Sequence, residues 1–178
     1  APAIEALEYQ AVKFYDGYDY YGHKLPVYEQ PPSDEVDKAW ANLYKTGAVK
    51  ITKSQASQLT NKTWPITGDT ENYFVAFEIF HQLHCLDVLR QAAYRDHYNE
   101  TESPATLRHC LAGLRQGIMC SVDISPIVWQ WSDHYNKAME RVDTIHSCRN
   151  FERFQEWVSL HALDIETINL GIRLDLDL

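Results

Sequence analysis

The sequence lacks any run of roughly eighteen apolar residues, so none of its segments is long enough to cross a bilayer as a helix. It is also poor in positive charge, with 16 Lys and Arg against 25 Asp and Glu and a net charge of -9. Nucleic acids and anionic membrane surfaces are recognised by clustered Lys and Arg, so we expect neither as a partner. With 45% apolar and 23% charged residues, a chain of 178 predicts one globular domain with its own core.

Cysteine is scarce too, but the number is even, which allows two disulfides. The four residues are Cys85, Cys110, Cys120 and Cys148. Two glycosylation sequons lie in polar, turn-like surroundings, at Asn61-Lys62-Thr63 and Asn99-Glu100-Thr101. Such triplets also arise by chance, but together with the cysteines they favour a secretory compartment over the cytosol. The chain opens at Ala1-Pro2-Ala3 with no signal peptide, and we expect a targeting or anchoring segment upstream.

The N-terminal segment 1–32 is rich in tyrosine and ends at Pro31-Pro32. We expect it to wrap a helical core, 33–178, within a single domain 1–178. Exposed tyrosines lining a substrate groove are the alternative. The flanking patterns predict a strand over 9–15, a turn over 15–21, a helix from its cap at Ser33 to about 45, a short helix near Ser54 and a loop over 64–69.

Helices dominate the rest of the prediction. Apolar residues recur at helical spacing from about 73 to 94, with no Gly or Pro among them. Ser103 and Pro104 have the cap and first-turn chemistry of a second helix, which we expect to run to about 120. The remaining expectations are a packed loop over 123–132, a helix over 150–163, and a strand or loosely held tail over 165–178. The predicted class is mainly α, with an irregular or short β N-terminal segment.

The two central helices carry an internal repeat. His84-Cys85-Leu86-x-x-Leu89-Arg90-Gln91 recurs as His109-Cys110-Leu111-x-x-Leu114-Arg115-Gln116. A repeat on consecutive helices predicts a central antiparallel helical hairpin with approximate twofold symmetry, in which the two His-Cys steps face each other.

This arrangement predicts a metal site. His81 and His84 are three residues apart and project from one face of the first helix, and His109 would come from the second. Imidazole suits copper, zinc, iron or nickel, and three ligands leave a coordination position open, as catalytic sites do. Ordinary hydrogen-bonded histidines are the alternative.

The cysteines and neighbouring residues extend this hypothesis. Cys85 shares the face of His81, so it could be a thiolate ligand, but we expect disulfides Cys85–Cys110 and Cys120–Cys148 in an oxidising lumen. His146 lies two residues before Cys148 and is a possible further ligand. Glu78, one turn before His81, could orient its imidazole or be a solvated surface residue.

At these positions the chain resembles a known family. Phe80-His81-Gln82-Leu83-His84-Cys85-Leu86, followed by His109-Cys110, is similar to the paired His-x-x-His-Cys signature of the UstYa-like family of fungal secondary-metabolism oxidases. Further motifs fall in the family's order: Val36-Asp37-x-x-Trp40-x-x-Leu43, Arg115-Gln116-x-x-Met119-Cys120-x-x-Asp123, and His146-x-Cys148-Arg149-x-Phe151 followed by Glu156-Trp157.

The resemblance implies a type II single-pass anchor upstream and a domain in the lumen of the ER or Golgi. It implies copper dependence, and oxidative cyclisation, hydroxylation or chlorination of a small-molecule or peptide natural product with O2. A homo-oligomer or a paralogous partner would be compatible with it.

One position departs from the family's pattern. The second copy reads Thr106-Leu107-Arg108-His109-Cys110, so a threonine replaces its first histidine. With Glu78 and Asp123, Thr106 is expected to surround the ligands. Two functions are therefore considered. The first is a copper-dependent oxidase that uses His81, His84 and His109 as ligands. The second is a non-redox cyclase or binding protein of the same pathways, in which His or Asp residues act as acid and base. Zinc, or no metal at all, is the alternative to copper.

Overall fold

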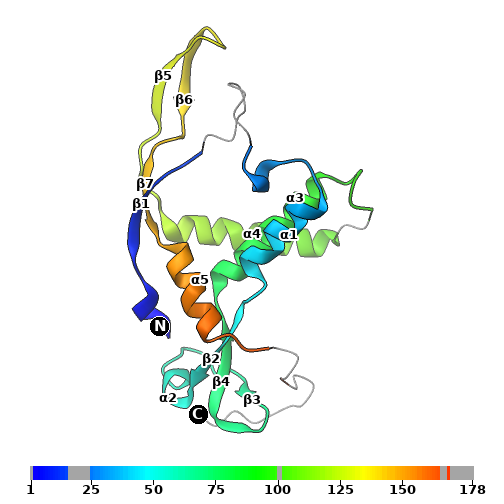
Figure 1. Cartoon of the computed structure of the whole chain (residues 1–178), viewed down its shortest axis with the longest axis vertical. Coiled ribbons are helices and arrows are strands. Elements are labelled where there is room, and N and C mark those ends of the chain that lie inside the picture. Colours follow the sequence, from blue (N-terminus) through cyan, green and yellow to red (C-terminus); the bar gives the residue numbers. More distant parts are fainter. Residues whose placement is uncertain (1, 16–24, 100–101, 165–167, 169–178) are drawn as a thin grey trace. The chain divides into compact units, whose positions relative to one another are not determined.

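The fold is known from a computed structural model that describes residues 2–15, 25–99, 102–164 and 168 (Figure 1). Helices make up 43% and strands 23% of it, and the strands form three separate antiparallel sheets. The prediction of a mainly α protein is therefore wrong, and the fold is mixed α/β. The predicted turn over 15–21 and tail over 165–178 fall almost entirely outside the described residues.

The chain divides into two compact units. The first is built from Ala1–Glu8, Leu43–Leu83 and Asn150–Leu178. It contains a three-stranded sheet in the order β2-β4-β3, with helices packed beside it. Its elements are η1 (Ile4–Ala6), β2 (Ala48–Thr52), α2 (Lys53–Ala56), β3 (Pro65–Ile66), β4 (Asp69–Ala76) and α5 (Phe151–Leu160).

The core of this unit explains why a predicted helix start was wrong. The pattern placed a helix from about 73, but β4 runs to Ala76 and the helix begins only at Glu78. Tyr73 lies opposite Ile51 of β2, and both side chains are buried in one cluster. The aromatic spacing fits a helix and a strand equally well here, and pairing with β2 decides the outcome. The predicted loop over 64–69 also contains the short strand β3.

Helix α5 closes the same cluster with Val158, Phe154 and Trp157. Its predicted presence is confirmed, and its N-cap is Asn150, whose side chain accepts a hydrogen bond from the Arg153 amide at 3.0 Å. The short helix near Ser54 is confirmed as α2, which begins with a capping box formed by Thr52 and Gln55.

The second unit is built from Tyr9–Asn42 and His84–Arg149. It has two small sheets: β1 pairs with β7, and β5 pairs with β6, both antiparallel. Strand β1 confirms the strand expected over 9–15, and the helix capped by Ser33 is confirmed as α1. The elements are β1 (Tyr9–Lys13), η2 (Val27–Glu29), α1 (Asp34–Tyr44, which ends in the first unit), α4 (Pro104–Ser121), β5 (Val128–Ser132), β6 (Lys137–Arg141) and β7 (Ile145–Arg149).

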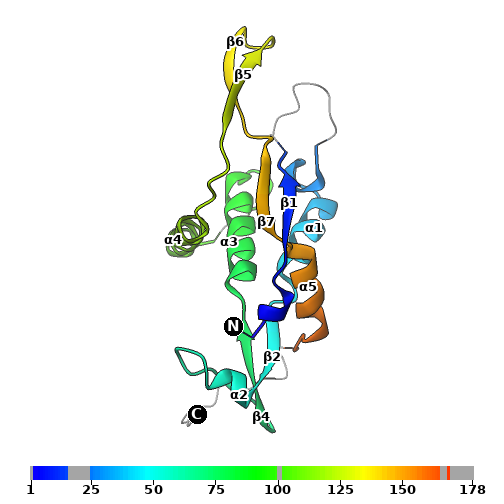
Figure 2. The ribbon, with the colours of Figure 1, turned by 90° about the vertical axis from the view of Figure 1, so that its left-hand side faces the viewer.

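Helix α3 (Glu78–Ala93) is continuous across the division of the chain at residue 83. The start of α4 is as predicted, with the Ser103 hydroxyl accepting from the amide of Thr106. The predicted antiparallel hairpin of α3 and α4 is wrong. Figure 2 looks almost along the axis of α4 while α3 runs in the plane of the page, so the two helices cross steeply. They meet through one small buried cluster of Cys85, Val88 and Cys110, packed by Leu89, Leu107 and Leu114.

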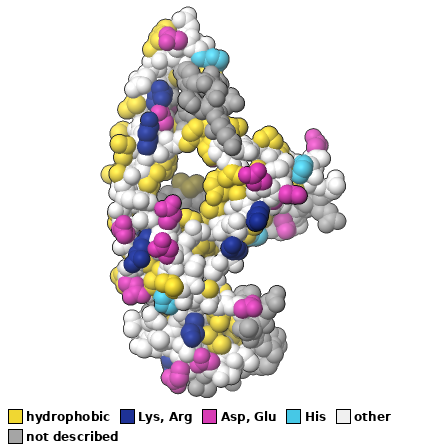
Figure 3. Space-filling model, in the orientation of Figure 1, with side chains coloured by type: hydrophobic (Ala, Val, Ile, Leu, Met, Phe, Trp, Pro, Cys, Tyr) yellow, Lys and Arg dark blue, Asp and Glu magenta, His cyan; other side chains and the backbone are white. Residues whose placement is uncertain are grey.

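The stretch 123–132 is not a packed loop. Its second half is strand β5, which forms a hairpin with β6. Trp129 and Trp131 are 68% and 64% exposed, so the tryptophans are not core residues. In the view of Figure 3, hydrophobic side chains reach the surface along the upper part of the molecule, where this hairpin lies.

A charged network fixes the part of α3 that belongs to the second unit. The Arg90 guanidinium donates to Asp87, Asp37 and the Tyr98 hydroxyl, each at 2.7 Å. The side chains of Arg90 and Asp87 are only 9% and 3% exposed. The guanidinium also lies 5.5 Å from the ring centroid of Trp40 on α1, close enough for a cation–π contact. Two residues of the Val36-to-Leu43 motif therefore contact α3.

Among the described residues, no helix combines the length and the apolar composition needed to cross a membrane.

Candidate metal centre

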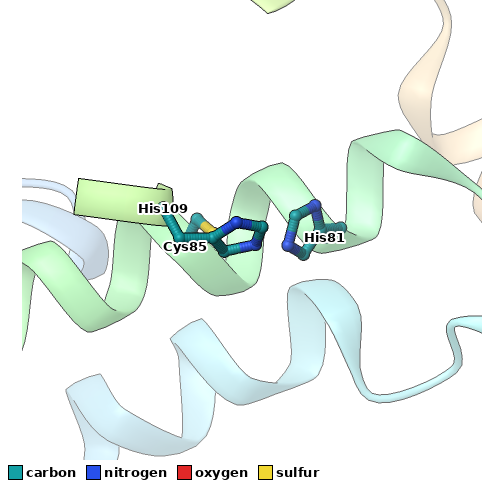
Figure 4. Close-up of side chains that lie close together, drawn as sticks. All are labelled: His81, Cys85 and His109. Carbon is teal, nitrogen blue, oxygen red and sulfur yellow. The ribbon is translucent and has the colours of Figure 1, made fainter. Parts of the chain in front are cut away.

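Three donor side chains converge where α3 and α4 cross. They are His81 and Cys85 of α3 and His109 of α4, and their ligand atoms all lie within 4.8 Å of one another. Figure 4 shows the imidazoles of His81 and His109 side by side, with the Cys85 sulfur next to them. The group therefore contains two of the three predicted histidine ligands, together with a thiol.

Helix geometry and the crossing explain this convergence. His81 and Cys85 are four residues apart on one helix, which places them on the same face, one turn apart. His109 precedes Cys110, and Cys110 is buried against Cys85 in the contact between the helices. Cys85 is 1% exposed, the His81 side chain is 39% exposed, and His109 is exposed. The group thus has a buried side, at the sulfur, and an open side, at the imidazoles.

The donor set fits a transition metal. Thiolate and imidazole bind zinc or copper at about 2.0–2.3 Å, which sets donor atoms roughly 3.5 Å apart around a shared ion. Donors within 4.8 Å reach that spacing by small rotations of exposed imidazoles. Three protein ligands leave a position for water or substrate, as in catalytic sites.

His84 is the predicted ligand that the structure leaves out of this group. It lies on an exposed part of α3, and Cys85 takes its place. At about 100° per residue, the third residue after His81 lies roughly 60° to one side of it and the fourth roughly 40° to the other. Helix α4 crosses on the side of the fourth residue.

Of the residues expected around the ligands, Glu78 contacts a donor side chain and Thr106 lies outside the donor group. Glu78 Oε1 lies 3.4 Å from His81 Nδ1, which leaves Nε2 as the natural donor to a metal. Thr106 is in the first turn of α4, one turn before His109, and its hydroxyl is 3.0 Å from that of Ser103. It does not belong to the donor group.

His146 and Asp123 form a pair of their own. His146 Nδ1 is 2.7 Å from Asp123 Oδ2, and its Nε2 is 3.3 Å from the Thr144 hydroxyl. The ring of Phe14 stacks on the imidazole with centroids 3.6 Å apart. Hydrogen bonds from Ser125, and then from His146, lower the pKa of Asp123 to about 2. His146 therefore contacts Asp123, Thr144 and Phe14 and does not belong to the donor group. Thr144 and Phe14 were not among the site residues predicted from the sequence.

The four cysteines are thiols in this structure. Cys85 and Cys110 share one buried cluster, whereas Cys120 is exposed and Cys148 is half-buried opposite Gln10 of β1. The two predicted disulfides stay predictions.

Both predicted glycosylation sites have an exposed asparagine, Asn61 and Asn99. In the first sequon, the Thr63 hydroxyl donates to the Phe74 carbonyl at 2.6 Å. In the second, residues 100–101 lie outside the described part of the chain. Glycosylation stays a prediction.

Comparison with known proteins identifies the family. A sequence model described as "Mycotoxin biosynthesis protein UstYa" matches residues 1–161. The chain belongs to the UstYa family. This membership confirms the resemblance that was based on the His-Cys motifs. The description of the family associates it with mycotoxin biosynthesis.

Individual relatives of this UstYa-family chain carry two kinds of name. UstYa family oxidase phomYc of Diaporthe leptostromiformis is 29% identical over 153 residues, 76% of this chain and 59% of that protein. Oxidase ustYa of Aspergillus flavus is 32% identical over 87 residues, 48% of this chain and 40% of that protein. Transacylase cctO of Talaromyces islandicus is 27% identical over 185 residues, 92% of this chain and 60% of that protein.

The chain spans about half to three-fifths of the length of the relatives that it matches over most of its own length. No solved structure matches it.

Proposed function

We propose that this chain is part of a copper-dependent oxidase of fungal secondary metabolism, with His81, Cys85 and His109 as the copper ligands. The observation that carries the proposal is the convergence of these three donors within 4.8 Å at the crossing of α3 and α4. The oxidase names of several family relatives support the reaction class.

Copper rather than zinc is supported by the donor set together with the oxidase names. Two imidazoles and one thiolate form a known donor set for redox-active copper, and zinc has no redox chemistry. Bound copper would supply one-electron oxidation and activation of O2 at the open position. The reaction we propose acts on a C–H bond of a small-molecule or peptide natural product, with cyclisation, hydroxylation or halogenation as the outcome.

The residues of this chain have separate tasks in the proposed site. Glu78 accepts a hydrogen bond from His81 Nδ1 and so orients the imidazole with Nε2 toward the ion. Cys85 gives the site a buried anionic donor, and burial keeps water away from that side. His109 lies at the exposed edge, where substrate would approach. We further propose that the domain works in the secretory lumen and is anchored through a segment upstream.

Matched histidine variants test the proposal, because His84 and His109 occupy equivalent positions in the repeat and both are exposed. Copper binding to the full chain is followed by calorimetry and electron paramagnetic resonance. We expect His109→Ala to weaken binding by more than about 100-fold, since losing even a ligand's partner costs about 10–100-fold. His84→Ala should change affinity less than threefold. Equal losses in the two variants would refute this ligand set.

The thiolate has its own signature. A Cu(II)–thiolate bond gives a strong visible charge-transfer band, which we expect in the wild type and not in Cys85→Ser. A copper complex that lacks this band in the wild type would remove Cys85 from the site.

A second candidate function is non-oxidative cyclisation or group transfer in the same kind of pathway. It is favoured by the relative named a transacylase, which matches 92% of this chain. Full turnover of the natural substrate after rigorous metal stripping would support this candidate, whereas activity restored only by copper would exclude it.

A further inference from the structure

Three side chains outside the donor group form a linear chain of hydrogen bonds. Asp123 Oδ2 is 2.7 Å from His146 Nδ1, and Nε2 on the other side of the ring is 3.3 Å from Thr144 Oγ1. A carboxylate, an imidazole and a hydroxyl in this order are the components with which enzymes activate a hydroxyl group for nucleophilic attack.

The charges fix the direction of each hydrogen bond. Asp123 is ionised, since hydrogen bonds from Ser125 and His146 hold its pKa near 2. An ionised carboxylate only accepts, so His146 Nδ1 carries a proton and donates it. In the neutral imidazole Nε2 then has a free lone pair, and the Thr144 hydroxyl donates to it. This is the tautomer that a general base acting on Thr144 requires.

The backbone holds the group in place. His146 lies on β7 opposite Val12 of β1, and the Thr144 carbonyl accepts from the Phe14 amide at 3.0 Å. The Phe14 ring lies on the imidazole with an interplanar angle of 12°. The His146 side chain is 12% exposed, so the base is shielded, and Thr144 is half-buried.

We propose that Thr144 is the nucleophile of an acyl-transfer site, with His146 as its general base and Asp123 as the residue that positions His146. The Thr144 oxygen attacks the carbonyl carbon of an ester or thioester, and its proton passes to His146 Nε2. The tetrahedral adduct collapses, the bond to the leaving group breaks, and His146 returns the proton to the leaving alcohol or thiol. An acceptor alcohol, amine or water then takes the acyl group from Thr144 by the reverse sequence.

The surroundings indicate the class of acyl group. Phe14 is 43% exposed beside the imidazole, and Ile124 and Ile127, on the segment that carries Asp123, are 89% and 54% exposed. An exposed aromatic ring on the base, and exposed apolar side chains on the segment that carries Asp123, favour an apolar acyl chain over a charged one. This inference does not rest on the copper site, and its test needs no metal, so failure of either proposal leaves the other standing.

The test uses p-nitrophenyl hexanoate and mass spectrometry of the full chain. We expect a burst of p-nitrophenol and a single hexanoyl group on the peptide that contains Thr144, stable to neutral hydroxylamine as an oxygen ester should be. Thr144→Ser should keep the label and Thr144→Val should abolish it. Ser147→Ala removes a neighbouring hydroxyl from the opposite face of β7 and should label like the wild type.

Several results would overturn the proposal. They are a wild-type chain without label, a label that hydroxylamine removes and that therefore sits on a cysteine or a histidine rather than on the Thr144 oxygen, and equal labelling of Thr144→Val. Thr144→Ser keeps the test valid if the valine variant misfolds, because loss of the label in a folded serine variant also counts against it.

The role of Asp123 is tested by measuring the acylation rate at saturating ester and KM separately. We expect Asp123→Asn to lower the acylation rate at saturating ester at least tenfold with an unchanged KM, and Asp123→Glu to recover part of the rate. A change in KM alone would assign Asp123 a purely structural role.

Discussion

Replacement of Arg90 by methionine should destabilise the protein far more than loss of an average surface charge. The guanidinium makes three hydrogen bonds of 2.7 Å, and one of its partners, Asp87, has a side chain that is only 3% exposed. Methionine fills a similar volume but leaves the Asp87 charge buried without its cation. Burial opposes the charged form of Arg90, yet the hydrogen bonds to Asp87, Asp37 and Tyr98 outweigh it and raise the pKa of the group.

The magnitude follows from burial. Removing one partner of a buried ion pair costs about 3–5 kcal/mol. The Asp37 side chain is 38% exposed and adds little, because water can replace its partner. With an m-value of about 2 kcal/mol per molar urea, the unfolding midpoint should fall by roughly 2 M.

Urea unfolding followed by circular dichroism measures this shift, with Arg153→Met as the matched control. Arg153 pairs with Glu156 at 3.6 Å, but the two side chains are 55% and 68% exposed, so the control should lose at most about 1 kcal/mol. If the two variants differ by less than 1 kcal/mol, the buried network does not stabilise α3 as we argue.

Two further predictions concern acid stability and thiol reactivity. Burial raises the pKa of Asp37, but hydrogen bonds from Tyr98 and Arg90 outweigh it and lower the pKa below 3.8. Because the pKa of Asp37 is lower in the folded than in the unfolded state, its ionised carboxylate stabilises the fold above the unfolded-state pKa, and this stabilisation is lost as pH falls through the folded-state pKa. Asp37→Asn should therefore flatten the acid limb of a plot of unfolding free energy against pH. In the reduced protein under native conditions, iodoacetamide should alkylate exposed Cys120 at once and buried Cys85 and Cys110 only after unfolding. Equal rates of alkylation would contradict the burial of these two thiols.

The sequence was a good guide to helices that carry their own end signals. Ser103 and Pro104 predicted the start of α4 correctly, and Ser33 that of α1, because caps act locally. Strands β2, β5, β6 and β7 gave no comparable signal. They are short, and the last three expose most of their residues, so their stability comes from pairing with another strand rather than from local preference; the partner is distant in sequence for β7 and adjacent for β5 and β6.

The candidate site also depends on how separate elements contact one another, which local sequence patterns do not specify. The spacing correctly placed His81 and Cys85 on one face of a helix, and it named His109 as the donor from the other helix. It could not choose between His84 and Cys85, because these flank His81 on opposite sides and the choice depends on how α4 crosses. The Thr144–His146 contact was equally hidden, since it depends on strand β7, which was not predicted and which begins directly after Thr144.

The buried position of Cys85 makes two fates of its sulfur mutually exclusive. The thiol adjoins Cys110 in one cluster and belongs to the donor group with His81 and His109. A sulfur that forms a disulfide no longer has a thiolate charge to offer an ion. Oxidation before copper arrives would leave two imidazoles to hold the metal, whereas copper bound first would shield the thiol from oxidants. The order of these two events during maturation would decide which form of the protein accumulates.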